Sequence, residues 1–220
     1  LPLPDAQHQA VPAMSPGPIH PSLRGAFSLV ELLVVIAILG LLLVFSMPAL
    51  QSLNGGLDLT RAADLVNGQL SLARQTAISR NRTVEVRFYS YAQDGGPARI
   101  RAVQPFVGSE EAEGEWQPLM RPQSLPRRTC LDSGMTLSPL LASQTNRTGS
   151  EAGVALPGIG LSYAYSVVSF RPDGSVDLPA GADFATLKAA RLDDPLSQLP
   201  ENYAIIQVSP VSGRQRTYRP

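Results

Sequence analysis

The apolar and polar positions divide the chain into stretches with different periodicities. From Phe27 to Phe45 every residue is apolar or small except Glu31. About 19 helical residues at a rise of ~1.5 Å span about 28 Å, close to the ~30 Å hydrocarbon core of a bilayer. This run therefore predicts a helix that crosses a membrane, with one carboxylate near its start.

After Pro48 the pattern becomes amphipathic. Apolar residues recur at spacings of three and four, which is one face of a helix packed against a sheet. Asp58 is a candidate N-cap, and Asn54-Gly55-Gly56 predicts a weakened or interrupted helix before it. The expected buried face consists of Leu59, Ala62, Val66, Leu70, Ala73 and Ala77.

From residue 83 onward the pattern changes to that of strands. Val84, Val86 and Phe88 alternate with charged residues, as in a half-buried strand. Glycine and proline clusters at 93–97 and 171–174 predict turns, and residues 110–115 and 138–160 predict loops. Several short strands after one long helix indicate an α+β protein with an antiparallel globular part. The expected strands cover 84–88, 99–103, 163–170, 176–178, 204–208 and 216–218.

Composition narrows the class of protein. The 220 residues allow one domain plus an anchor, and the net charge of zero gives no overall field toward nucleic acid or acidic lipid. The single cysteine, Cys130, excludes a disulfide within the chain. We expect Cys130 to be a half-buried small hydrophobic residue, with an intermolecular bridge as the alternative.

The start of the apolar run has the features of a processing signal. Phe27-Ser-Leu-Val-Glu31, preceded by small residues and followed by an aliphatic helix, resembles the type III signal of type IV pilins and pseudopilins. The resemblance implies cleavage by a prepilin peptidase between Ala26 and Phe27, and N-methylation of Phe27. That family usually has Gly where Ala26 stands, so the Gly25–Ala26 bond is the alternative. Glu31 is then the fifth mature residue, and Pro48 falls where many pilins carry a helix-kinking proline.

Three pieces of the remaining chain give a second resemblance. They are residues 70–81 (LSLARQTAISRN), 170–175 (FRPDGS) and 205–216 (IIQVSPVSGRQR). Together they resemble the minor pseudopilin H family of type II secretion, its FimT-like minor-pilin relatives, and the Verru_Chthon cassette protein D group. The resemblance implies a pilin-like fold, in which a long N-terminal helix leans on an antiparallel β-sandwich of two sheets.

The two resemblances imply an organisation for the whole chain. Residues 1–26 are a leader, 27–47 a transmembrane and assembly helix, 48–81 an amphipathic helix, and 82–220 an extracytoplasmic β domain. The chain starts with Leu, and Met14 is an alternative start of the leader. The implied location is the bacterial inner membrane, single-pass with a periplasmic domain, and then a fibre. The implied partners are prepilin peptidase, other pilin or pseudopilin subunits, the inner membrane and an assembly platform.

Glu31 and Pro48 have expected roles in assembly. In a fibre, Glu31 can pair with the amine of Phe27 on a neighbouring subunit, which sets register because an unpaired charge in an apolar core is costly. A snorkelling carboxylate in a plain membrane anchor is the alternative. Pro48 can kink the helix, or it can end the membrane helix at the interface.

The expected function is that of a structural, non-enzymatic subunit without cofactor or metal. Both histidines, His8 and His20, lie in the implied leader, so the mature chain would lack histidine-based catalysis and most zinc sites. The alternative is a DNA-binding minor pilin of an uptake system. Three arginines near the C-terminus could contact phosphates, or they could protect a sheet edge. They are Arg214, Arg216 and Arg219.

Overall fold

The computed structural model describes residues 28–109, 115–142, 155–189 and 199–220, without the side chains of 44–55. It divides into two units, Leu1–Ser46 and Met47–Pro220, and each is considered by itself below. The implied leader, the bond between Ala26 and Phe27, both histidines and most of the expected acidic loop lie outside the described residues.

The first helix, α1, runs from Leu29 to Arg80 over 52 residues. Ser28 caps it: the N–H of Val30 donates to Ser28 Oγ at 3.3 Å, and the N–H of Leu32 donates to Ser28 O at 3.1 Å. Glu31 therefore occupies the third position after the cap, where a carboxylate favours the positive end of the helix dipole. The sequence reading missed this local role of Glu31.

The beginning of α1 carries a continuous set of exposed apolar side chains. Its large hydrophobic residues from Leu29 to Leu43 are between 43% and 79% exposed. None of the helices in the described part of the chain has the length and apolarity that a bilayer crossing requires.

The helix continues through Gly56, so the expected interruption at 54–56 is wrong, and Asp58 is not an N-cap. Tertiary contacts override the low helix propensity of glycine here. The carbonyl of Gly56 accepts from Thr60 Oγ1 at 3.0 Å and from Arg219 Nη2 at 3.1 Å. Pro48 lies within the bounds of α1, and a kink there stays a prediction.

The strands form one antiparallel sheet in the order β6-β1-β2-β5-β7-β8-β9, with β3 and β4 also paired to β2. This confirms the α+β class. The expected strand at 176–178 is reduced to a bridge between Phe170 and Val176, and β7 was not expected. The elements after α1 are β1 Val84–Tyr91, β2 Arg99–Gly108, β3 Trp116–Pro118, β4 Gln123–Ser124, β5 Thr129–Leu131, α2 Pro139–Ala142, β6 Ala164–Phe170, β7 Phe184–Ala189, β8 Tyr203–Val208 and β9 Gln215–Tyr218.

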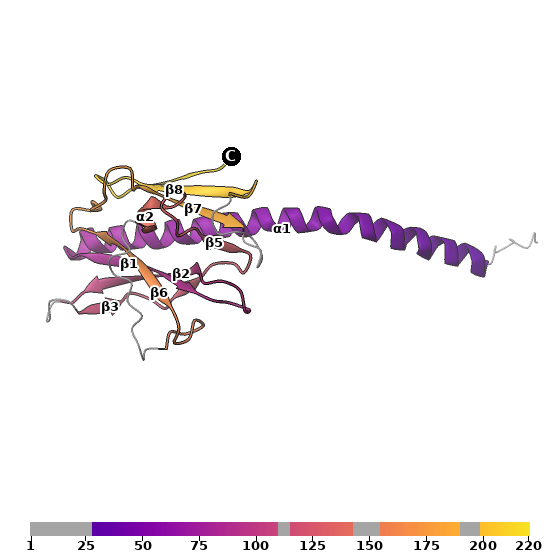
Figure 1. Ribbon diagram of the computed structural model, residues 1–220, viewed down its shortest axis with the longest axis horizontal. Helices are drawn as coiled ribbons and strands as arrows, with labels where there is room; N and C mark the ends of the chain where they lie inside the picture. Colours follow the sequence, from indigo (N-terminus) through magenta and orange to yellow (C-terminus); the bar gives the residue numbers. More distant parts are fainter. Residues whose placement is uncertain (1–27, 110–114, 143–154, 190–198) are drawn as a thin grey trace, which may run out of the picture. The chain divides into compact units, whose positions relative to one another are not determined.

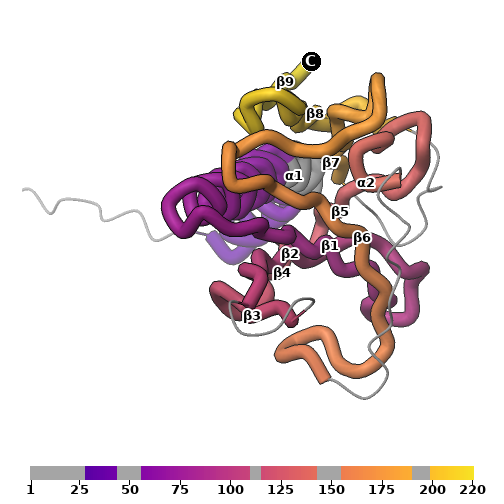
Figure 2. The backbone as a smooth tube through the Cα atoms, turned by 90° about the vertical axis from the view of Figure 1, so that its left-hand side faces the viewer, coloured from indigo at the N-terminus to yellow at the C-terminus, as the bar shows by residue number. Residues whose placement is uncertain are grey.

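The sheet wraps around the C-terminal half of α1. In Figures 1 and 2, β1, β2, β3 and β6 lie on one side of this half, and β7, β8 and β9 lie on the other. A single residue pair, Ile100 and Leu131, joins β2 to β5 and so connects the two sides. The two sheets that the resemblance implies are therefore two halves of one hydrogen-bonded sheet.

The core lies between α1 and the sheet. All six residues of the expected helix face are at most 2% exposed, which confirms that face. Three of them are alanines, whose small side chains let the helix and the strands approach closely. Their partners include Val86 and Phe88 of β1, Val168 of β6 and Ile206 of β8.

The other face of β1 and β2 is also buried, so the expectation of a half-buried strand at 84–88 is wrong. A second cluster built around Tyr89, Phe106 and Tyr163 covers it. The guanidinium of Arg87 lies 4.0 Å from the centre of the Phe106 ring, and Glu85 Oε2 is 3.7 Å from Arg87 Nη2. Aromatic side chains thus cover the charged residues of this strand and bury them.

A buried ion pair connects β7 to the residue that follows β5. Lys188 Nζ lies 2.6 Å from Asp132 Oδ2, and these side chains are 2% and 4% exposed. Cys130 is opposite Lys188 in the strand register and is only 1% exposed. Burial raises the pKa of the Cys130 thiol, partly offset by Arg99, whose Nη1 lies 3.9 Å from the sulfur. The thiol is therefore a buried core group.

The buried ion pair leads to a prediction about the stability of the chain. In the structure, the N–H of Gly134 donates to Asp132 Oδ1 at 2.7 Å. Asp132→Asn keeps an acceptor for this N–H but removes the negative charge beside the Lys188 ammonium. We expect the free energy of unfolding to fall by about 3 kcal/mol or more, because removing one charge of a buried ion pair is strongly destabilising. Denaturant titration of the full chain in mild detergent, followed by circular dichroism, measures this.

Asp94→Asn is the matched control. It removes a surface ion pair with Arg127, at 3.0 Å, whose side chains are 77% and 55% exposed. Asparagine also tolerates the positive φ of 53° at this position. A loss below about 1 kcal/mol is expected. Equal losses for the two variants would contradict the assignment.

Candidate functional site

The candidate site is built on the hairpin of β8 and β9 at the C-terminal end of the chain. Gln207 pairs with Arg216 and Val208 with Gln215, so the two strands expected at 204–208 and 216–218 form a hairpin. In the connecting turn, the N–H of Ser209 donates to Arg214 O at 2.9 Å. The closed hairpin therefore fixes the backbone positions of residues 214 and 216.

Besides the bond from Arg219 to Gly56 O given above, four polar contacts fix this hairpin along α1. Their partners are 138 to 159 positions apart in the chain. They place β9 and its turn beside the second half of the helix. They are Asn67 Nδ2 to Thr217 Oγ1 at 2.7 Å, Ser71 Oγ to Gln215 Oε1 at 3.0 Å, Arg74 Nε to Ser212 O at 2.6 Å, and Arg219 Nη1 to Thr60 Oγ1 at 2.8 Å.

Two glycine turns meet next to these contacts. Gly213 has a φ of +61°, and a Cβ added there would lie 2.1 Å from the carbonyl oxygen of Gly174. Gly174 has a φ of +82°, and a Cβ there would lie 2.8 Å from Cδ1 of Ile78. The pieces 70–81, 170–175 and 205–216 therefore pack against one another, which gives a steric reason for both glycines.

The turn that contains Gly174 is closed by its own aspartate. Both the N–H and the hydroxyl of Ser175 donate to Asp173 Oδ1, at 2.8 and 2.6 Å. These bonds lower the pKa of the Asp173 carboxyl, because they favour its charged form. The ionised carboxylate thus holds the turn in the shape that contacts Gly213.

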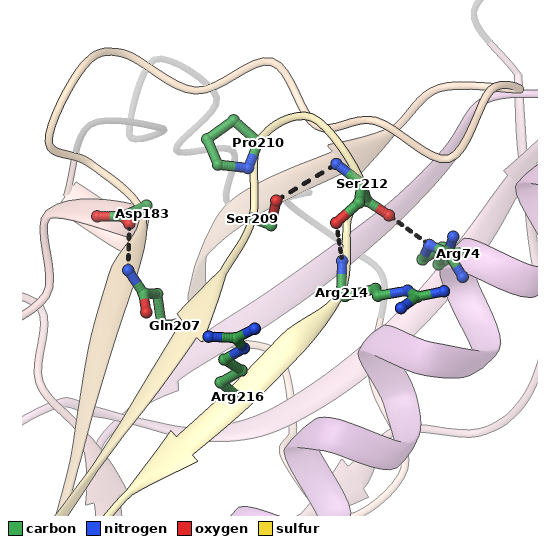
Figure 3. Close-up of a pocket in the computed structure, with 8 residues that line it drawn as sticks. All are labelled: Arg74, Asp183, Gln207, Ser209, Pro210, Ser212, Arg214 and Arg216. Carbon is green, nitrogen blue, oxygen red and sulfur yellow. Dashed lines mark hydrogen bonds between the residues drawn. The ribbon is translucent and has the colours of Figure 1, made fainter.

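A pocket of about 570 Å³ opens beside the hairpin turn. Figure 3 shows Asp183 and Gln207 on one side of it, and Arg74 and Arg214 on the other. Gln207 Nε2 donates to Asp183 Oδ2 at 2.6 Å. The lining carries three arginines against one aspartate, so it is net positive and suited to an anion. The lining residues are Arg74, Asp183, Gln207, Ser209, Pro210, Ser212, Arg214 and Arg216.

The three C-terminal arginines do not act as one set. Arg214 and Arg216 line the pocket, whereas Arg219 donates to the helix at Thr60 and Gly56. The sequence reading missed Arg74, which comes from the helix. The signal for it was its place in the piece 70–81, one of the three pieces that carry the second resemblance.

The other expected site residues fall elsewhere. Glu31 lies in the first turn of α1, and Ala26 and Phe27 lie outside the described residues. In the described ranges, no group of three or more His, Cys, Asp or Glu residues is arranged to hold a metal ion. Among the described residues, the geometry supports the pocket beside the hairpin turn as the candidate site.

Comparison with known protein families identifies the family of this chain. The profile of the Type II transport protein GspH matches residues 62–198, more than half of the chain. The chain belongs to the GspH family. The matched range extends from the buried face of α1 past β7, and the Prokaryotic N-terminal methylation motif matches residues 22–47. This GspH protein thus joins a methylation signal to a pseudopilin domain.

Two solved structures are similar to this chain. One is the type IV minor pilin FimU of Pseudomonas aeruginosa, with 14% identity and a TM-score of 0.40 over 74% of this chain and 92% of FimU. The other is the minor pseudopilin EpsH from the Type 2 Secretion System of Vibrio cholerae, with 14% identity and a TM-score of 0.42 over 74% and 98%. No curated protein matches the sequence.

The contact between the two glycine turns makes a prediction. Gly213→Ala places a Cβ against the Gly174 carbonyl, so the hairpin turn must move away from the turn at 171–174. We expect a loss of unfolding free energy of at least about 2 kcal/mol beyond the backbone strain. The loss is measured by denaturant titration of the full chain in mild detergent.

Gly181→Ala is the control, because Gly181 has a φ of +77° and nothing within 4 Å of its added Cβ. It should show only the strain of a left-handed alanine, about 1–2 kcal/mol. If Gly213→Ala costs no more than Gly181→Ala, the two turns do not hold each other.

Proposed function

We propose that this GspH protein is a minor, structural subunit of a type II secretion or type IV pilus-like fibre. It is inserted by its N-terminal helix and presents its β domain on the fibre. The observation that carries the proposal is the contrast along α1. One face of its C-terminal half is buried by the chain's own sheet, while the apolar side chains from Leu29 to Leu43 are exposed within a matched methylation motif.

In this proposal, the exposed apolar residues are covered by partners outside the chain. Burying one large aliphatic side chain is worth about 1.5–3 kcal/mol, so leaving a dozen of them in water is strongly unfavourable. In this proposal the inner membrane covers them first, as a single-pass anchor formed by residues 27–47. The helices of other subunits cover them after an assembly platform has moved the subunit into the fibre.

Processing precedes assembly in this proposal. A prepilin peptidase removes residues 1–26 by cutting between Ala26 and Phe27, and the new amine of Phe27 is methylated. The methylation motif at 22–47 supports this step. The remaining chain then starts one residue before Ser28, which caps α1.

Glu31 has two compatible roles in the processed chain. Within its own subunit it lies in the first turn of α1, near the positive end of the helix. Between subunits it can pair with the cationic amine of a neighbouring Phe27, which favours one helix register over its alternatives. Pro48 is proposed to let α1 bend when helices pack.

A nucleic-acid role for the C-terminal arginines has less support from the contacts. Arg219 is bonded to α1, and the pocket that contains Arg214 and Arg216 also contains a carboxylate. Duplex binding usually draws on an extended set of cationic side chains along the phosphate backbone. We therefore favour a structural role over DNA uptake.

The mature N-terminus tests the proposal. In cells that express a prepilin peptidase, mass spectrometry should find a chain that starts at N-methylated Phe27. Cells with an inactivated peptidase should retain the leader and serve as the control. A chain that starts at Ala26 would move the cleavage site to the Gly25–Ala26 bond and leave the rest of the proposal unchanged. An intact leader in the presence of active peptidase would contradict the proposed processing and with it the fibre role.

A further inference from the structure

The pocket beside the hairpin turn has a charge arrangement that neither the core nor the N-terminal helix explains. Arg74 reaches it from α1, and Arg214 and Arg216 reach it from the hairpin. Within the described part of the chain, none of these guanidinium groups forms an ion pair. Like charges that converge in a concave surface favour a bound anion, because it relieves their repulsion.

The arginine side of the pocket is partly held in place. Arg74 donates through Nε to Ser212 O at 2.6 Å, and its Cδ would lie 3.2 Å from a Cβ on Gly213. The N–H of Arg214 faces Ser212 Oγ at 3.5 Å. The turn therefore holds Arg74 and the backbone of Arg214 in place, which lowers the entropy lost when a ligand binds.

The opposite side of the pocket selects among anions. Asp183 lies there, and only one of its oxygens, Oδ2, accepts from Gln207 Nε2. A phosphodiester backbone offers acceptors alone, so Asp183 repels it. A peptide backbone offers N–H groups that can donate hydrogen bonds to Asp183. An acidic side chain of the same peptide can form ion pairs with the guanidinium groups.

The size of the pocket fits a short segment. A volume of about 570 Å³ lies within the range of about 300–1,000 Å³ that is usual for ligand pockets. The chain as a whole has no net charge that would attract a long polyanion. The contacts therefore favour a few residues of an acidic peptide over a nucleic-acid duplex.

We propose that this pocket docks an acidic peptide segment of a neighbouring fibre subunit. One carboxylate of the segment pairs with Arg214 and Arg216, and a backbone N–H donates to Asp183. The identity of the partner as a fibre subunit rests on the proposed function. The pocket's preference for an acidic peptide does not, because it can be measured without processing or assembly.

Fluorescence anisotropy with the full chain in mild detergent tests the pocket. The probe is a labelled pentapeptide of alternating glutamate and small residues, acetylated and amidated at its ends. We expect the same peptide with glutamine in place of glutamate to bind at least about tenfold more weakly. Arg214→Gln combined with Arg216→Gln should weaken glutamate-peptide binding by a similar factor, and Arg216→Gln alone by less.

Arg121→Gln is the matched control, because Arg121 is exposed and does not line the pocket. It should change binding less than twofold, as expected for a distant surface charge. Thermal unfolding of each variant verifies the fold before binding is compared. Equal weakening by Arg121→Gln, or equal binding of the glutamine peptide, would overturn the inference.

Two competitors separate this inference from its rivals. A 20-base-pair DNA duplex and inorganic phosphate are added to the preformed peptide complex at fixed ionic strength. Displacement by DNA at lower concentration than by unlabelled peptide would overturn the inference in favour of nucleic-acid binding. If the peptide binds as expected but the mature N-terminus retains its leader, the fibre role fails while the pocket assignment stands.

Discussion

The burial of one face of α1 against the sheet is the constraint on which the rest of this structure depends. Leu59, Leu70 and the alanines between and after them are almost completely buried. Because alanine side chains occupy little space, strands on both sides of the helix can approach it, and the sheet closes around it. The C-terminal hairpin then lies within reach of Asn67, Ser71 and Arg74, and those contacts build the pocket.

The N-terminal half of the same helix has the opposite property. From Leu29 to Leu43 its large side chains are exposed, and the described part of the first unit offers nothing to cover them. In the proposed function, the globular part buries its own core, whereas other molecules cover the N-terminal part. The GspH match begins in the C-terminal half of α1, and the methylation motif ends in its N-terminal half.

The parts predicted from the sequence were those set by local periodicity. The helix face from Leu59 to Ala77 and most strands follow from spacings of a few residues. The errors depended on residues far apart in the chain: Arg219 supports the helix at Gly56, and aromatic residues of β2 and β6 bury Arg87 of β1. The pocket was predictable only in part, because Arg214 and Arg216 stood out as a cluster, whereas Arg74 and Asp183 meet them only through the fold.

The central claim is that other subunits cover the exposed face of α1 once the chain is processed. Photo-crosslinking from position Ile36, which is 59% exposed, tests it directly in cells that assemble a fibre, with Val211, 86% exposed on the hairpin turn, as the control position. The account predicts that processed chains crosslink from Ile36 to the N-terminal helix of another pilin-like subunit, and that Glu31→Ala sharply reduces this product without blocking membrane insertion. Processed chains that crosslink from Ile36 to no subunit, or an unchanged product in Glu31→Ala, would contradict it.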